Sequence, residues 1–361
     1  MSEKWSRRKM LQASGLTALS SVTWSPARSP SAAARSSDMP KICLGVSPNL
    51  DDKGMNELKQ IGVDYVLMGG PRIPWEEADI RSRMDRFKAV GITVCNMMIS
   101  GFNDVIWGKP GADDQIEQVI KSIRAAGKAG LPVIEYNFYA NRLIEGYKEE
   151  VGRGGAGYTA YDYELSRNLP PREGVGTHSR ADQLKRAEHF LKAIVPEAEK
   201  AGTRLALHPN DPPVPLSRGS EQIMATVEHW KQYLNLVKSP YNGITYDCGV
   251  IREMGEDPVA VCRYLGERDL INHAHFRNVR VRNSYVDYTE VFLDEGQVNL
   301  FAVMKELVRQ KYARAIYPEH PRAIDIDRER SIRNQYPGGG GFAGEIYNVA
   351  YTRAMLQASL A

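Results

Sequence analysis

Long apolar runs are scarce in this chain of 361 residues. After residue 34 no stretch approaches the roughly 20 apolar residues that a membrane-spanning helix needs, so we expect no membrane span. Near the N-terminus, Arg7-Arg8 precedes a weakly apolar stretch, residues 11–24, and Ala32-Ala33-Ala34 offers an A-x-A-like cleavage site. We therefore predict a twin-arginine signal peptide over residues 1–34. Export by that route would place the protein in the periplasm or outside the cell.

An excess of charge of one sign is also missing. The chain has 47 basic and 44 acidic residues, and residues 1–34 hold five basic residues and one acidic residue. The remaining chain therefore has 42 basic and 43 acidic side chains. A protein that binds nucleic acid usually carries a basic surface, so we expect no nucleic-acid partner.

Cysteine is rare, with four residues at Cys43, Cys95, Cys248 and Cys262. In an oxidising compartment this even number permits disulfides, in any of three pairings. The first three lie in apolar, strand-like runs, where buried free thiols are common. The sequence leaves both possibilities open.

After residue 40 the chain alternates short β-like runs with amphipathic helical stretches, which favours a parallel α/β fold. The predicted strands are residues 42–47, 64–68, 92–97, 132–138, 203–208, 243–248, 270–276 and 315–319. The predicted helices are residues 52–61, 76–89, 114–129, 180–201, 220–236, 257–265, 299–311 and 343–358, with Asp113-Asp114, Ser179 and Ser220 as candidate N-terminal caps. Eight such units indicate a single (β/α)8 TIM-barrel catalytic domain over residues 35–361.

No glycine-rich dinucleotide fingerprint follows the first predicted strand, where residues 47–51 read Ser-Pro-Asn-Leu-Asp. This absence weakens a Rossmann-type interpretation. Two connections, residues 139–179 and 277–298, are too long for simple turns. Both follow strands and would rise from the face where barrels place their active sites, so we predict functional lids. Disordered segments, or contacts in a homo-oligomer, remain alternatives.

Four segments at the ends of the last four predicted strands contain metal-ligand residue types. They are residues 207–213, 246–249, 272–279 and 317–322, and they supply the candidates His208, Cys248, His275 and Glu319. Of His273 and His275, we expect only one to face the barrel interior. Because neighbouring parallel strands end on one face of a barrel, the four segments predict an enzyme with one divalent ion.

These segments resemble the D-mannonate dehydratase family, within the xylose-isomerase-like barrels. Residues 208–213, His-Pro-Asn-Asp-Pro-Pro, are similar to that family's H-P-D-D-P-P, and Tyr-Asp-Cys-Gly at 246–249 matches its strand-end cysteine. Residues 275–279 are similar to its H-x-R-N-V, and residues 318–322 to its R-P-D-H-G-R. The likeness spans residues 42–358. It implies one Mn²⁺-type ion held by His208, Cys248, His275 and Glu319, with glutamate in place of the family's aspartate; Fe²⁺ and Zn²⁺ remain open.

The chemistry of such a reaction suggests roles for further residues. Dehydration of a sugar acid removes a proton next to a carboxylate and expels hydroxide, and a divalent cation stabilises the charge that develops. We expect His320 to transfer a proton, because the pKa of histidine lies near neutrality. Arg277 and Arg322 are candidates to bind the substrate carboxylate. The alternatives are that His320 only supports a ligand and that the arginines brace loops.

Other candidates lie on the predicted fourth strand and near the C-terminus. Tyr136 and Asn137 are expected to orient substrate hydroxyls, and Asp211 is a further candidate for substrate contact. The family's tyrosine after Pro-Gly is replaced by Gly339, so Tyr336 becomes the candidate catalytic tyrosine.

The leading hypothesis is a metal-dependent sugar-acid dehydratase, which converts D-mannonate to 2-keto-3-deoxy-D-gluconate and water. One alternative is a sugar isomerase or epimerase on the same metal-binding barrel. Another is a non-catalytic exported protein that binds sugar acids.

Overall fold

Eight parallel strands form the closed barrel that the sequence predicts. The computed structural model describes residues 38–330 and 336–361, and its barrel runs in the order β1-β14-β11-β10-β7-β4-β3-β2. The strands are β1 (Lys41–Gly45), β2 (Tyr65–Gly69), β3 (Thr93–Met98), β4 (Val133–Tyr136), β7 (Arg204–Leu207), β10 (Asn242–Asp247), β11 (Ile271–His275) and β14 (Ala315–Tyr317). Each coincides with a predicted strand, so the (β/α)8 fold is confirmed.

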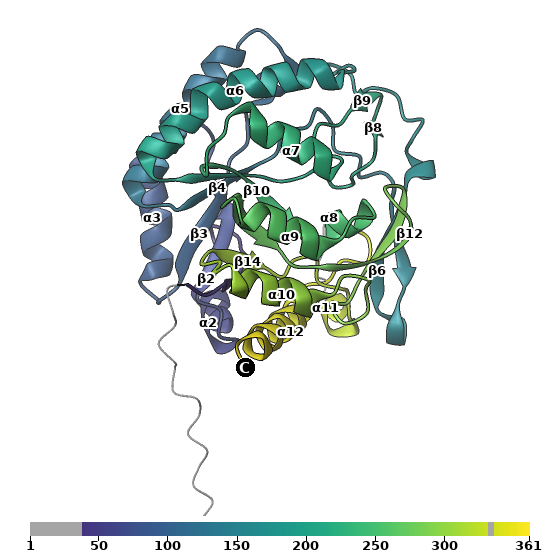
Figure 1. Ribbon diagram of the computed structural model, residues 1–361. Helices are drawn as coiled ribbons and strands as arrows, with labels where there is room; N and C mark the ends of the chain where they lie inside the picture. The colour runs from purple at the N-terminus through teal and green to yellow at the C-terminus, as the bar shows by residue number, and fades with distance from the viewer. Residues whose placement is uncertain (1–37, 331–335) are drawn as a thin grey trace, which may run out of the picture. The chain divides into compact units, whose positions relative to one another are not determined.

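Helices surround these strands on the outside of the barrel (Figure 1). They are α2 (Asp52–Gln60), α3 (Glu77–Lys88), α4 (Asn103–Trp107), α5 (Ala112–Ala129), α6 (Arg180–Ala201), α7 (Val227–Leu236), α8 (Cys248–Glu253), α9 (Pro258–Gly266), α10 (Leu300–Arg309), α11 (Asp325–Glu329) and α12 (Phe342–Leu360). The short helices α4, α8 and α11 were not predicted, because one or two turns carry too little hydrophobic periodicity to be recognised.

Local signals set the helix ends. The Ser179 side chain accepts a hydrogen bond from the Asp182 amide at the start of α6, as predicted. The prediction that Ser220 caps a helix is wrong, because this residue pairs in a small hairpin of β8 (Leu216–Ser217) and β9 (Ser220–Glu221). Helix α7 therefore begins later, with Thr226 as its cap.

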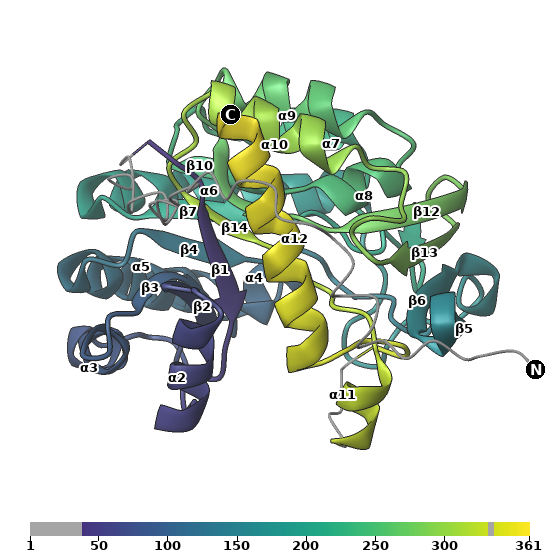
Figure 2. The same ribbon diagram turned by 90° about the horizontal axis from the view of Figure 1, so that it is seen from below.

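The two long connections form a second sheet together. Its antiparallel order is β12-β13-β6-β5, with β5 (Tyr147–Val151), β6 (Gly157–Asp162), β12 (Asn278–Asn283) and β13 (Asp287–Val291). Short 3-10 turns lie at Arg153–Gly155 and Tyr163–Leu165. Tyr161 and Tyr288 stack with ring centroids 5.3 Å apart, so apolar packing joins the two connections. Figure 2 shows these strands gathered beside one end of the barrel.

The described cysteines Cys43, Cys95, Cys248 and Cys262 are all buried and free. Among the helices of the described part of the chain, none has the length and apolar character to cross a membrane. The predicted signal peptide, residues 1–34, lies outside the described residues.

Candidate metal centre and active site

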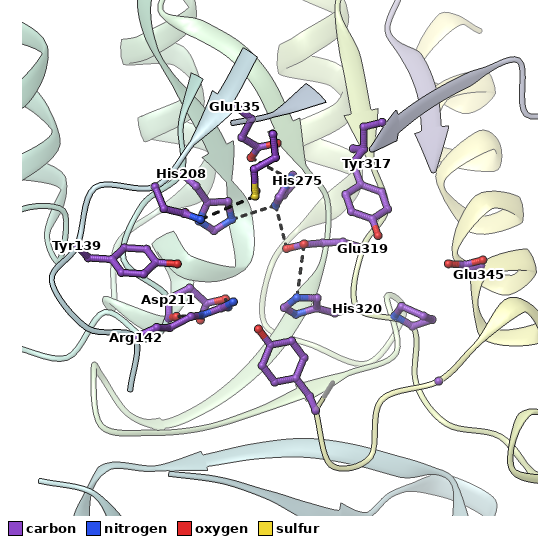
Figure 3. A pocket seen from close by; sticks show the side chains of 16 residues that line it. Glu135, Tyr139, Arg142, His208, Asp211, His275, Tyr317, Glu319, His320 and Glu345 are labelled. Atoms are coloured by element: carbon purple, nitrogen blue, oxygen red, sulfur yellow. Dashed lines mark hydrogen bonds and ion pairs between the residues drawn. The ribbon is translucent and has the colours of Figure 1, made fainter. Parts of the chain in front are cut away.

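Four buried side chains converge at the carboxyl ends of four neighbouring barrel strands. His208 follows β7, Asp247 ends β10, His275 ends β11 and Glu319 follows β14. One ligand atom from each lies within 4.8 Å of the others. His275 Nδ1 is 3.0 Å from Glu319 Oε1 and 3.2 Å from His208 Nε2 (Figure 3). The convergence expected for the ends of parallel strands is therefore present.

The cluster contains Asp247 where the resemblance implies Cys248. Asp247 Oδ2 lies 3.9 Å from His208 Nε2 and 3.8 Å from His275 Nδ1. Cys248 begins helix α8, and its buried thiol donates to the Arg277 carbonyl oxygen at 3.2 Å. Burial raises the pKa of this thiol well above its ordinary value. Consecutive residues at a strand end point in different directions, so the strand end presents the carboxylate, not the sulfur, to the cluster.

The electrostatics of the cluster favour positive charge. Burial alone would lower the pKa of His275, but Glu319 and Glu135 raise it to about 9. His208 Nδ1 lies 2.8 Å from the Pro209 carbonyl oxygen, and an N–H donated there leaves Nε2 as a lone pair facing the cluster. Two imidazole nitrogens and two carboxylates suit a divalent ion such as Mn²⁺, Fe²⁺ or Zn²⁺.

Glu135 supports this cluster, although the sequence pointed to its neighbour Tyr136 as the residue that would contact substrate. The Glu135 carboxylate is buried, 3.5 Å from His275 Nε2, and accepts hydrogen bonds of 2.8 Å from Asn96 and Thr245. It therefore orients His275, as a carboxylate beside the far ring nitrogen of a metal-binding histidine commonly does. The sequence did contain a sign of this role, because Glu135 is a charged residue within an apolar strand. An unpaired charge in the core is costly, so such a residue is expected to have a partner.

Tyr136 points the other way, so its predicted contact with substrate hydroxyls is wrong. Its hydroxyl lies 2.9 Å from that of Tyr233 on α7, and its ring packs against Phe190 on α6. Side chains alternate along a strand, so Glu135 and Asn137 face the interior while Tyr136 faces the helices.

The expectation that only one of His273 and His275 faces the interior is also wrong. Both are buried, and their ring centroids are 5.0 Å apart. Residues two apart in a strand share a face, which explains the arrangement. His273 lies in the layer below His275 and, with Glu135, forms a second group of ligand types.

A cavity of about 300 Å³ opens beside the cluster. Its lining includes the predicted residues Asn137, Asp211, His320 and Tyr336, together with His208, His275 and Glu319. Arg142, which was not predicted, also lines it. Arg142 Nε donates to the Asp211 carbonyl oxygen at 2.9 Å, and its guanidinium lies 5.3 Å from the centroid of the Tyr336 ring. Asp211 and Tyr336 therefore position a cationic group at the cavity wall.

Arg277 and Arg322 are not among the described residues that line the cavity, which corrects their predicted contacts with substrate. Both are only 2% exposed. Arg277 Nη1 lies 2.6 Å from Glu253 Oε1, while Arg277 Nε lies 3.1 Å from Asp247 Oδ2 and 3.2 Å from Glu319 Oε1. Arg277 therefore braces its neighbours, which is the alternative role that the sequence left open.

His320 connects the cluster to the second sheet. Its Nδ1 lies 2.9 Å from Glu290 Oε2 on β13, and its Nε2 lies 3.5 Å from Glu319 Oε2. Arg322 Nη2 donates to the same Glu290 oxygen at 2.8 Å. Burial would lower the pKa of His320, but Glu290 and Glu319 raise it. The ring also faces Tyr336, with centroids 5.4 Å apart.

The fold and the cluster first define a class, that of metal-dependent enzymes on the xylose-isomerase-like barrel. A solved L-ribulose 3-epimerase shares this barrel, with a TM-score of 0.54 and 16% identity, over 89% of this chain and 96% of that chain. At that identity the similarity shows the fold alone.

Within this class, the chain belongs to the D-mannonate dehydratase (UxuA) family, whose profile matches residues 173–360. Mannonate dehydratase from Thermotoga maritima is 31% identical over 321 residues, which cover 78% of this chain and 88% of that protein. The crystal structure of mannonate dehydratase from Streptococcus suis serotype 2 aligns with a TM-score of 0.80 and 26% identity, over 89% of this chain and 95% of that chain.

Family membership confirms the predicted hydro-lyase over the isomerase and the binding protein, and it confirms dependence on a metal. The prediction of export to the periplasm or the extracellular space is wrong, because the mannonate dehydratases that match are cytoplasmic metabolic enzymes. An arginine pair before a weakly apolar stretch is too short a pattern to outweigh that relationship.

Proposed function

We propose that this chain converts D-mannonate to 2-keto-3-deoxy-D-gluconate and water with one divalent ion, Mn²⁺ in the first instance. The observation that carries the proposal is the position of His320. Its imidazole lines the same cavity as Glu319 of the cluster and the cationic side chain of Arg142. One cavity therefore contains a histidine that can transfer a proton, an arginine that can bind a carboxylate and a cluster of side chains that can bind a metal ion.

His208, Asp247, His275 and Glu319 would hold the ion. When bound, a divalent cation stabilises negative charge on the substrate's carboxylate and hydroxyl oxygens. The Glu319 carboxylate is buried and its Oε1 lies 3.0 Å from His275 Nδ1, so two ligand-type atoms face the same point, which fits a ligand role.

The chain's own groups supply binding and proton transfer. Arg142 binds the substrate carboxylate, because its guanidinium offers paired donors at the cavity wall. Asn137 bonds to substrate hydroxyls, since within the described part of the chain its amide donates only to Met98 Sδ, at 3.9 Å. His320 exchanges a proton with substrate at Nε2, while Glu290 fixes the ring through Nδ1. Burial raises the pKa of Tyr336, so its hydroxyl remains a donor near neutral pH.

The test is incubation of the purified protein, loaded with Mn²⁺, with D-mannonate. We expect a 2-keto-3-deoxy acid, detected by its carbonyl reaction and by mass spectrometry as loss of one water. An isomer of unchanged mass would contradict dehydration, and recovery of unreacted D-mannonate with every divalent metal tried would contradict the proposed substrate.

A further inference from the structure

Glu345 carries another carboxyl group to the cavity, on the side away from Arg142. It lies in the first turn of α12 and is one of the residues that line the cavity. Figure 3 shows Arg142 and Glu345 on opposite sides of Glu319 and His320. A chain-like acid held at one end by Arg142 would therefore extend past the cluster toward Glu345.

The usual partners of a carboxylate at a helix start are already in use. Asp327 Oδ2 accepts hydrogen bonds from the Gly341 and Gly344 amides at 2.9 and 3.0 Å, and its Oδ1 accepts one from Ala343 at 3.0 Å. Asp327 thus satisfies the N-terminus of α12 and leaves Glu345 without that support.

Within residues 38–330 and 336–361, no hydrogen bond or ion pair engages the Glu345 carboxyl group. Among the described residues, the titratable groups that interact with it are Asp327 from α11 and Tyr317 from β14, and neither brings positive charge. Burial, followed by the Asp327 charge, raises the pKa of Glu345 to about 7. A partly buried carboxyl that lines the cavity and has no partner among the described residues can bond to the contents of the cavity.

We propose that Glu345 is a specificity residue, which accepts hydrogen bonds from hydroxyl groups at the uncharged end of the sugar acid and rejects a second acid group there. This inference rests on the proposed function, which places the substrate carboxylate at Arg142. A hydroxylated end offers donors to a carboxylate, whereas a terminal carboxylate or phosphate would meet like charge in a partly desolvated site.

The test compares binding of D-mannonate with binding of its six-carbon diacid, which has the same configuration and a carboxylate at both ends. Because the active Mn²⁺-loaded enzyme would consume D-mannonate, calorimetry uses the Mn²⁺-loaded His320→Asn protein, in which turnover is slow, alone and combined with Glu345→Gln or Glu345→Ala. It gives the ratio of the two dissociation constants at pH 8. We expect both substitutions to shift this ratio about tenfold toward the diacid. The matched control, Glu228→Gln in the exposed first turn of α7, should leave it unchanged.

The pH dependence of the His320→Asn protein with Glu345 intact is a second measurement, which needs no change at Glu345. Both carboxyls of the diacid are ionised above about pH 5.5. The protein with Glu345 intact should therefore disfavour the diacid increasingly as the pH rises through about 7, while addition of Glu345→Gln should give a constant ratio. A ratio that is independent of pH with Glu345 intact and unchanged by both substitutions would overturn the inference. Failure of the wild type to dehydrate D-mannonate would contradict the proposed function instead, because the binding ratio does not depend on turnover.

Discussion

Asp247 and Cys248 are neighbours in the chain, yet their side chains point to opposite sides of one strand end. The Asp247 carboxylate lies 3.9 Å from His208 Nε2, while the Cys248 thiol bonds to the Arg277 carbonyl oxygen in the core. Asp247 Oδ1 also accepts from the Val250 amide, which fixes the start of α8. The helix that begins there therefore sets which of the two side chains reaches the cluster.

The first prediction concerns metal retention. We expect Asp247→Asn to lose bound metal, because it removes a charged ligand while an amide oxygen can still cap α8. We expect Cys248→Ser to keep stoichiometric metal and to lose about 1–3 kcal/mol of stability from a buried polar group. Elemental analysis together with urea unfolding measures both effects. Loss of metal in Cys248→Ser with full occupancy in Asp247→Asn would restore the cysteine as the ligand.

The second prediction concerns Arg142. Arg142→Gln should raise KM for D-mannonate by about 10- to 100-fold, because a charge-assisted bidentate bond contributes roughly 1.5–3 kcal/mol. Steady-state kinetics checks this. Arg153→Gln is the control, since that arginine pairs with Asp294 outside the cavity lining. An unchanged KM in Arg142→Gln would mean that the carboxylate binds elsewhere.

The third prediction separates proton transfer from binding. His320→Asn should lower kcat by about 10²- to 10⁴-fold while substrate affinity is retained. Glu290→Gln should retain part of the activity and shift the pH profile, because Glu290 acts through the orientation and charge of His320. Steady-state rates from pH 5.5 to 9 give both results. Full turnover in His320→Asn would assign the proton transfer to another group.

The fourth prediction tests the bracing role of Arg277. Arg277→Met should cost about 3–5 kcal/mol of stability, because it leaves Asp247 and Glu253 as buried carboxylates without their counter-charge. The control Arg282→Met removes a 40% exposed partner of Glu150 and should cost less than about 1 kcal/mol. Denaturant unfolding of the metal-free proteins compares the two, and equal costs would argue against the bracing role.

The fifth prediction follows from the raised pKa of Glu345, about 7 against an ordinary value of 4.5. The folded protein holds this proton more tightly than the unfolded chain, so the stability due to Glu345 is complete below about pH 4.5 and falls as the pH rises through 7. Glu345→Gln should therefore become more stable than the wild type by up to about 3 kcal/mol above pH 7. Unfolding of both metal-free proteins at pH 5 and pH 8 measures the difference. No change in their relative stability would mean that the carboxyl is ionised at both pH values.

The barrel and part of the site could be predicted from the sequence, because each depends on the local pattern of residues. Alternating strand-like and helical stretches predicted all eight barrel strands, and the strand ends pointed to His208, His275 and Glu319. Local sequence pattern could not predict the position of Arg142 in the site. It comes from the first long connection, whose path depends on the pairing of β6 with β13.

The sequence by itself determined the barrel, the family and the strand ends that supply ligand types, because hydrophobic periodicity and short motifs are properties of neighbouring residues. Tertiary structure decided which side chain at each strand end faces inward. It placed Asp247 rather than Cys248, and Glu135 rather than Tyr136, at the centre. The physical reason is that barrel closure, strand register and the start of the next helix fix the direction of each side chain, and these depend on residues far apart in the chain.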